Sequence, residues 1–125
     1  MKILIIDDSL MDRKLLASLL KRSGVSQEIL QSVDGEEGIR TLSGNYQDIC
    51  LILLDWQMPK IDGIEFMKRV IQIPEAARIP IIMITASSSD ADKTTARSVN
   101  PNLAGYIVKP YNADVLMQAI RPYLK

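Results

Sequence analysis

The chain has 125 residues, of which 47% are hydrophobic and 24% charged, and its 15 basic and 15 acidic side chains cancel. A chain of this size can bury its own core, so we expect a single domain over residues 1–125 and no extensive disorder. The balanced charge argues against direct nucleic-acid binding, and the apolar runs are too short to cross a membrane. Because no signal-peptide pattern opens the chain, we expect a cytoplasmic protein. We also expect a monomer.

Histidine is absent, and Cys50 is the single cysteine. The sequence therefore excludes an internal disulfide and the Cys/His sets that bind zinc. It also lacks the commonest general base. Any chemistry must use carboxylates, lysine and hydroxyl groups.

Short apolar runs alternate with longer segments of helical period, which is the pattern of βα units around a parallel sheet. Strands are predicted at Lys2–Ile6 and, more weakly, at Glu28–Ser32. The helix between them is expected to end at Gly24 and to turn inward Leu15, Leu16, Leu19 and Leu20. A second helix is predicted to start at Asp34.

The middle of the chain repeats this alternation. A strand is predicted at Ile49–Leu54, and the Asp62-Gly63 turn should open a helix that ends near Pro74. The residues expected to be buried on this helix are Ile64, Met67, Val70 and Ile71. A strand at 81–84 follows, and then a polar helix over 87–99.

The last unit begins with a strand predicted at 103–108. Asn112 should cap the final helix, which Pro122 ends or distorts. The inward residues of this helix are expected to be Val115, Leu116, Ala119 and Ile120. The chain thus predicts an α/β fold with a doubly wound, five-stranded parallel sheet and five helices.

Polar residues follow the predicted strands where each one ends. Asp7 and Asp8 follow the first strand, Asp55 the third, Thr85 the fourth and Lys109 the fifth. Five right-handed units can wind in the order 2-1-3-4-5, which places strands one and three side by side at the switch point where ligands bind. We therefore expect these side chains to share one pocket.

Crowded carboxylates repel each other, and a bound cation would relieve the repulsion. Oxygen ligands of this kind suit Mg²⁺, which usually combines a few carboxylates with phosphate oxygens. Lys109 would add a positive charge, and Thr85 a hydroxyl donor, beside a phosphoryl group held there. The residues therefore indicate a magnesium-dependent phosphoryl site.

At this point the chain resembles the receiver domain of two-component response regulators, most closely the stand-alone chemotaxis type. The resemblance covers essentially the whole chain, and its motifs are specific when taken together. They are Ile5-Ile6-Asp7-Asp8-Ser9, Asp55-Trp56-Gln57-Met58-Pro59 with Asp62-Gly63, Thr85-Ala86, and Tyr106-Ile107-Val108-Lys109-Pro110-Tyr111.

The resemblance implies that Asp55 accepts a phosphoryl group from a phosphohistidine on a sensor histidine kinase or phosphotransfer protein. Asp8, Asp55 and the backbone carbonyl of Gln57 would bind Mg²⁺ directly, and Asp7 through water. Such a domain assists its own phosphorylation and slow autodephosphorylation and is not a turnover enzyme. Lys109 would pair with a phosphoryl oxygen.

The resemblance also implies a switch. Thr85 would bond the phosphoryl group while Tyr106 turns inward, changing the face formed by the segments 87–99, 103–108 and the final helix. Gln57, Ala86 and Ser87 would lie beside the phosphate. Gln57 and Ser87 would tune how long the phosphoryl group survives. A downstream protein, with the flagellar switch as the best guess, would bind that face.

Other functions use related parts. A phosphorylation-independent receiver would carry the same fold as an interaction module only. A haloacid dehalogenase-type phosphohydrolase needs an Asp-x-Asp pair and a cap, whereas Asp7 and Asp8 are adjacent and no insert is present. A flavodoxin-like or dinucleotide-binding protein needs a phosphate-cradling loop, whereas the segment from Asp7 to Asp12 would repel phosphate without a metal.

Overall fold

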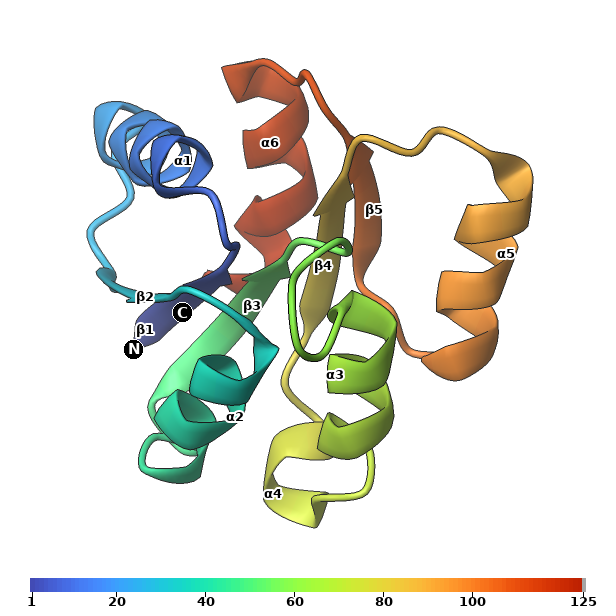
Figure 1. Ribbon diagram of the computed structural model, residues 1–125. Coiled ribbons are helices and arrows are strands. Elements are labelled where there is room, and N and C mark those ends of the chain that lie inside the picture. Colours follow the sequence, from blue (N-terminus) through green and yellow to red (C-terminus); the bar gives the residue numbers. More distant parts are fainter. Residues whose placement is uncertain (125) are drawn as a thin grey trace.

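Residues 1–124 are described by a computed structural model of the chain, shown in Figure 1. Within this range, five parallel strands form one sheet in the order β2-β1-β3-β4-β5. The strands are β1 (Lys2–Ile6), β2 (Glu28–Ser32), β3 (Ile49–Leu54), β4 (Ile81–Thr85) and β5 (Gly105–Val108). The α/β class and the strand order that the sequence predicts are confirmed.

The helices are α1 (Leu10–Arg22), α2 (Gly35–Ser43), α3 (Gly63–Val70), α4 (Pro74–Ala77), α5 (Asp90–Val99) and α6 (Ala113–Ile120), followed by the 3-10 helix η1 (Arg121–Tyr123). Most of them start at a polar cap, whose side-chain oxygen accepts a hydrogen bond from the backbone N–H three residues later. These caps are Ser9, Asp34, Asp62, Ser89 and Asn112. Within residues 1–124, every helix is too short or too polar to cross a bilayer.

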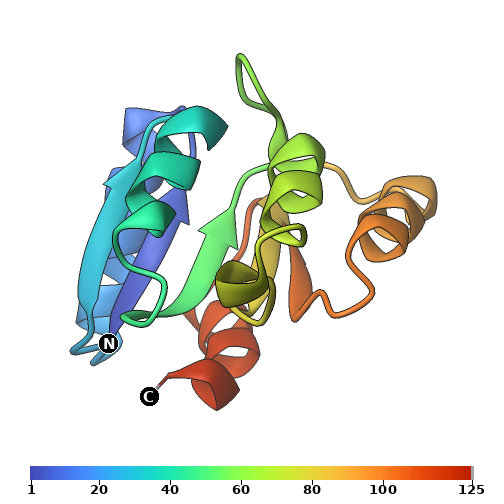
Figure 2. The same cartoon turned by 90° about the horizontal axis from the view of Figure 1, so that it is seen from below.

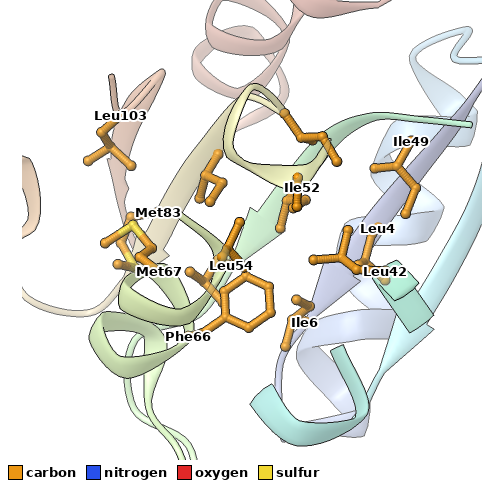
Figure 3. Packing of buried hydrophobic residues seen from close by; sticks show 14 of the residues in the cluster. Leu4, Ile6, Leu42, Ile49, Ile52, Leu54, Phe66, Met67, Met83 and Leu103 are labelled. Carbon is orange, nitrogen blue, oxygen red and sulfur yellow. The ribbon is translucent and has the colours of Figure 1, made fainter. Parts of the chain in front are cut away.

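The sheet separates two apolar cores, because successive side chains of a strand point to opposite faces. On one face, α1 and α6 pack on Ile3, Ile5, Leu51, Leu53 and Ile84. On the other, α2, α3, α4 and α5 cover Leu4, Ile6, Ile52, Leu54 and Met83 (Figures 1 and 3). Phe66 and Met67 of α3 fill the second core. The sheet is thus covered on both faces, and its carboxyl-end edge is left for a site.

Three apolar residues predicted to face inward are exposed instead: Leu15 by 58%, Val115 by 46% and Ile71 by 38%. In α1 the buried positions are Arg13, Leu16 and Leu20, so the inward stripe is centred one position beyond Leu15. Val115 lies beside the buried stripe of α6 in the same way, and Ile71 is the C-cap of α3. Apolar spacing therefore located the helices but not the centre of each buried face.

Several predicted boundaries were also wrong. α3 ends at Val70, close to Pro74 as predicted, but Pro74 itself occupies the first turn of the separate one-turn helix α4, where its missing N–H needs no partner. This helix brings the number of α-helices within residues 1–124 to six rather than five. The fifth strand starts at Gly105 and not at residue 103, and α5 starts at Asp90 after the cap Ser89.

The carboxyl ends of the strands meet at one edge of the sheet. Figure 2 shows the strand arrows pointing to this edge, with the loop between β3 and α3 projecting beyond it. β1 pairs with β2 on one side and with β3 on the other, and Ile6 lies beside Leu54. The residues that follow β1 and β3 are therefore neighbours.

Candidate functional site

Asp7 and Asp55 leave adjacent strands at the same level. The backbone N–H of Asp55 donates to the Ile6 carbonyl at 2.9 Å, which continues the β1–β3 ladder by one residue. One carboxylate oxygen from each of Asp7, Asp8 and Asp55 lies within 4.8 Å of the others. Asp7 is buried and Asp8 is exposed, so the group lies between the sheet and solvent. The structure thus brings together the acids that the sequence predicted would meet.

Lys109 reaches this group from the end of β5. Its Nζ lies 3.2 Å from an oxygen of Asp7, 3.5 Å from one of Asp55 and 2.9 Å from one of Asp12. The predicted meeting of Lys109 with the strand-end acids is therefore present. These residues line one end of a cavity of about 580 Å³ that runs between α1 and the start of α6.

The surroundings of the site shift the protonation of its groups. Burial raises the pKa of Asp55 to about 6, and the negative charge of Asp7 adds to the rise, while Lys109 partly offsets it. Burial alone would lower the pKa of Lys109. Its hydrogen bond to Asp12 and the charges of Asp55 and Asp7 outweigh burial, so that the pKa rises above the ordinary value. Lys109 is thus a permanent cation beside a carboxylate that is costly to ionise.

This carboxylate makes stability depend on pH. Folded Asp55 keeps its proton to higher pH than the unfolded chain does, so between pH 3.8 and about 6 its contribution to the free energy of unfolding falls as pH rises. Asp55→Asn removes this fall in the free energy of unfolding, because asparagine does not ionise. Without divalent cations, the variant should gain stability over the wild type by up to about 3 kcal/mol between pH 4 and pH 7. Urea unfolding of both proteins at each pH measures the gain; a constant difference across this range would contradict it.

Local hydrogen bonds fix the backbone that carries the acids. The Ser9 N–H donates to Asp7 Oδ1 at 2.9 Å. The buried guanidinium of Arg13 donates to the Asp7 carbonyl at 2.7 Å and to the Gln31 side chain at 3.2 Å. A buried cation of α1 therefore ties the end of β1 to β2. On the other side, the Gly63 N–H donates to the Trp56 carbonyl at 2.7 Å, which closes the loop after Asp55.

Thr85 and Tyr106 are joined through Ser87. The Ser87 N–H donates to Thr85 Oγ1 at 3.3 Å, and the Tyr106 hydroxyl donates to the Ser87 carbonyl at 2.9 Å. Ser87 Oγ donates in turn to Asp92 in the first turn of α5, and Lys93 lies over the Tyr106 ring, 5.8 Å from its centroid. Thr85 is 2% exposed and is not among the residues lining the cavity at Lys109. These contacts link Thr85 to Tyr106 more directly than to Asp55.

Gln57 and Ala86 lie in loops at the same edge of the sheet, and both are exposed. Their predicted roles beside a phosphate stay predictions. Sequence reasoning missed Asp12, Arg13 and Asp92 as partners of the site. Asp12 carried a usable signal, because it stands three residues after Ser9 in the first turn of a helix, and helical side chains tilt toward the N-terminus, where the end of β1 lies.

The donor set fits a hard divalent cation. Asp7, Asp8 and Asp55 offer only oxygen atoms, close enough together to share one ion, and their mutual repulsion would fall when an ion binds. Oxygen ligands on a partly exposed rim suit Mg²⁺, which keeps several waters in its shell. The site therefore has the chemistry for Mg²⁺.

Comparisons with known proteins show which family the chain is similar to. The model of the response regulator receiver domain matches residues 3–121. Chemotaxis protein CheY1 of Helicobacter pylori is 34% identical over 124 residues, which are 99% of this chain and 97% of that protein. The gliding motility regulatory protein of Myxococcus xanthus is 38% identical over 121 residues, 96% of this chain and 15% of that protein.

A solved structure of the chemotaxis response regulator CheY4 of Vibrio cholerae superposes with a TM-score of 0.85 at 28% identity and covers 98% of each chain. Sequence and fold therefore agree with this family over nearly the whole length. The chain belongs to the response regulator receiver domain family.

Proposed function

We propose that this receiver domain is a signalling switch that accepts a phosphoryl group on Asp55 with the help of Mg²⁺. Receiver domains of response regulators are signalling domains and not turnover enzymes. The proposed donor is a phosphohistidine on a sensor histidine kinase or a phosphotransfer protein. An oxygen of Asp55 attacks the phosphorus, and the phosphorus–nitrogen bond breaks with its electron pair left on the imidazole.

One observation carries this proposal. Asp55 lies within 4.8 Å of Asp7 and Asp8 through carboxylate oxygens, and Lys109 Nζ lies 3.5 Å from Asp55. Phosphoryl transfer requires mainly positioning and neutralisation of charge on the phosphoryl oxygens. A nucleophilic carboxylate beside a metal-binding pair of acids and a fixed cation meets both requirements.

Each residue of the site then has a proposed role. Asp8, Asp55 and the Gln57 carbonyl would hold Mg²⁺ directly and Asp7 would hold it through water; the bound ion would neutralise charge on phosphoryl oxygens. Lys109 would pair with one phosphoryl oxygen. The Thr85 hydroxyl would give up its bond from the Ser87 N–H and donate to another. Gln57, Ala86 and Ser87 would border the phosphoryl group and set how slowly it hydrolyses.

The proposed output is a changed protein-binding face made of α5, β5 and α6. Tyr106 of β5 is bonded to Ser87, in the loop that leads from Thr85 to α5, so a movement of this loop is transmitted to the ring. We propose that a single domain over residues 1–125 acts in the cytoplasm as a monomer and binds a downstream protein. Because the similar proteins include chemotaxis proteins, we propose control of chemotaxis through a flagellar switch.

Labelling with acetyl phosphate tests the proposal. We expect a gain of one phosphoryl group, about 80 Da by intact mass, only when Mg²⁺ is present. The label should be lost in base and kept in acid, as an acyl phosphate is. Circular dichroism on the same sample shows whether the chain is folded. A folded chain that gains no mass with Mg²⁺ would leave a phosphorylation-independent interaction module as the better reading.

A further inference from the structure

Within residues 1–124, Lys109 pairs with three acids that come from different parts of the fold. Asp7 and Asp55 follow strands of the sheet, whereas Asp12 lies in the first turn of α1. The shortest distance from Lys109 Nζ is to Asp12, at 2.9 Å, and the longest is to Asp55, at 3.5 Å. Among the acids that pair with Lys109, the one outside the strand-end group therefore has the closest contact.

The backbone of Asp12 is held in place by the first turn of its own helix. Its backbone N–H donates to the Ser9 side chain at 3.1 Å, and the Arg13 N–H donates to the Ser9 carbonyl at 3.0 Å. Its side chain is 41% exposed and lies at the rim of the cavity that Lys109 and Asp55 line. An anion at this rim attracts the lysine and repels an incoming phosphoryl group.

Asp12 is not one of the acids whose carboxylate oxygens lie close enough together to hold one cation. The group within 4.8 Å consists of Asp7, Asp8 and Asp55, and it is these oxygens that would hold a cation. When the Lys109 ammonium group pairs with Asp12, the carboxylate oxygens of Asp7 and Asp55 are more available to bind a metal. When the pair with Asp12 is broken, the Lys109 ammonium group competes with a metal for the carboxylate oxygens of Asp7 and Asp55.

We propose that Asp12 is a positioning residue that draws Lys109 away from Asp55, thereby favouring the metal-binding arrangement of the acids and restraining phosphoryl acceptance. The part that concerns phosphoryl acceptance rests on the function proposed above. The part that concerns metal binding does not. The two parts predict effects of opposite sign from one substitution, which a general loss of structure would not produce.

Metal affinity is the first test. Asp12→Asn keeps the side-chain size and removes the charge, so Lys109 is released toward Asp7 and Asp55. We expect the Mg²⁺ dissociation constant, read from the fluorescence of the single tryptophan Trp56, to rise about threefold to fivefold, the size expected for one partly exposed ion pair. Asp114→Asn is the matched control, because it removes an acid from the first turn of α6. It should leave the affinity within about 1.5-fold of the wild type.

A double-mutant cycle shows whether the effect passes through Lys109. In a Lys109→Ala background, Asp12→Asn should change the Mg²⁺ affinity by less than about 1.5-fold, because no ammonium group remains to be released. Asp12→Glu in the natural background keeps the charge and should restore most of the affinity. An equal loss of Mg²⁺ affinity with and without Lys109 would show that the charge of Asp12 attracts the cation directly and not by positioning Lys109. That result would overturn the proposal.

Phosphoryl acceptance is the second test. With Mg²⁺ saturating for each protein, Asp12→Asn should be labelled by acetyl phosphate about threefold to fivefold faster than the wild type, and raised salt should shrink the ratio. An unchanged or lower rate would overturn the restraining role of Asp12. If the wild type takes up no label at all, the proposed function fails, whereas the Mg²⁺ cycle still decides whether Asp12 positions Lys109.

Discussion

Asp55→Asn is expected to abolish Mg²⁺-dependent labelling by acetyl phosphate while the chain stays folded. The amide has the shape of the carboxylate, but its oxygen is a far weaker nucleophile, so an acyl phosphate cannot form at this position. Burial and the charge of Asp7 raise the pKa of Asp55 to about 6, so the ionised carboxylate destabilises the folded state. The fold should survive because the substitution removes this buried charge. Intact mass after incubation measures the label, and urea unfolding measures the fold.

The matched control is Asp62→Asn. Asp62 lies in the same loop as Asp55 and caps α3 by accepting the Glu65 N–H at 2.9 Å. Asparagine caps helices about as well as aspartate, so this variant keeps the loop and should be labelled like the wild type. Equal labelling of Asp55→Asn and the wild type would show that another carboxylate is the acceptor, and peptide mapping would then identify it.

Gly63→Ala should destabilise the protein and disturb the site together. A Cβ atom at Gly63 would lie 2.6 Å from the Asp55 carbonyl oxygen and 2.9 Å from Trp56 Cα. Backbone atoms cannot swing aside as a flexible side chain does, so the loop after β3 must shift. We expect a loss of about 1–3 kcal/mol in the free energy of unfolding, together with slower labelling of Asp55. Urea unfolding and the rate of mass gain measure the two effects.

Gly44→Ala is the same substitution at an open position. A Cβ atom there has nothing within 4 Å, and the backbone φ of −99° suits alanine. The variant should be as stable as the wild type, or more stable by about 0.4–1 kcal/mol, because alanine restricts the unfolded chain. If Gly63→Ala proved as stable as Gly44→Ala and labelled normally, the close approach of Gly63 to the loop after Asp55 would be wrong.

The strand order and the meeting of Asp7, Asp8, Asp55 and Lys109 could be predicted, because they follow from topology. Parallel strands that alternate with helices must carry their carboxyl ends to one edge, whatever the side chains around them. The exposure of Leu15 could not be predicted in this way. It depends on how α1 is rotated on the sheet, which is set by packing of Leu16 and Leu20 and by the buried Arg13.

The same limit applies within the site. The bond from Tyr106 to Ser87 and the pairing of Lys109 with Asp12 depend on the path of loops and on the first turn of a helix. Spacing in the sequence says that these residues leave neighbouring strands or start a helix, but it does not say which oxygen lies nearest a given nitrogen. The roles of Thr85, Tyr106 and Gln57 in a response to phosphorylation stay predictions.

The contact between Tyr106 and the loop after β4 ends on a main-chain atom. The hydroxyl donates to the carbonyl of Ser87, while the Ser87 side chain turns to Asp92. The hydrogen bond from the ring to the loop therefore does not use the side chain at position 87, which contacts Asp92 instead. If the proposed function holds, a substitution at position 87 would change a side chain beside the phosphoryl group and still leave the hydrogen bond from Tyr106 to the loop in place.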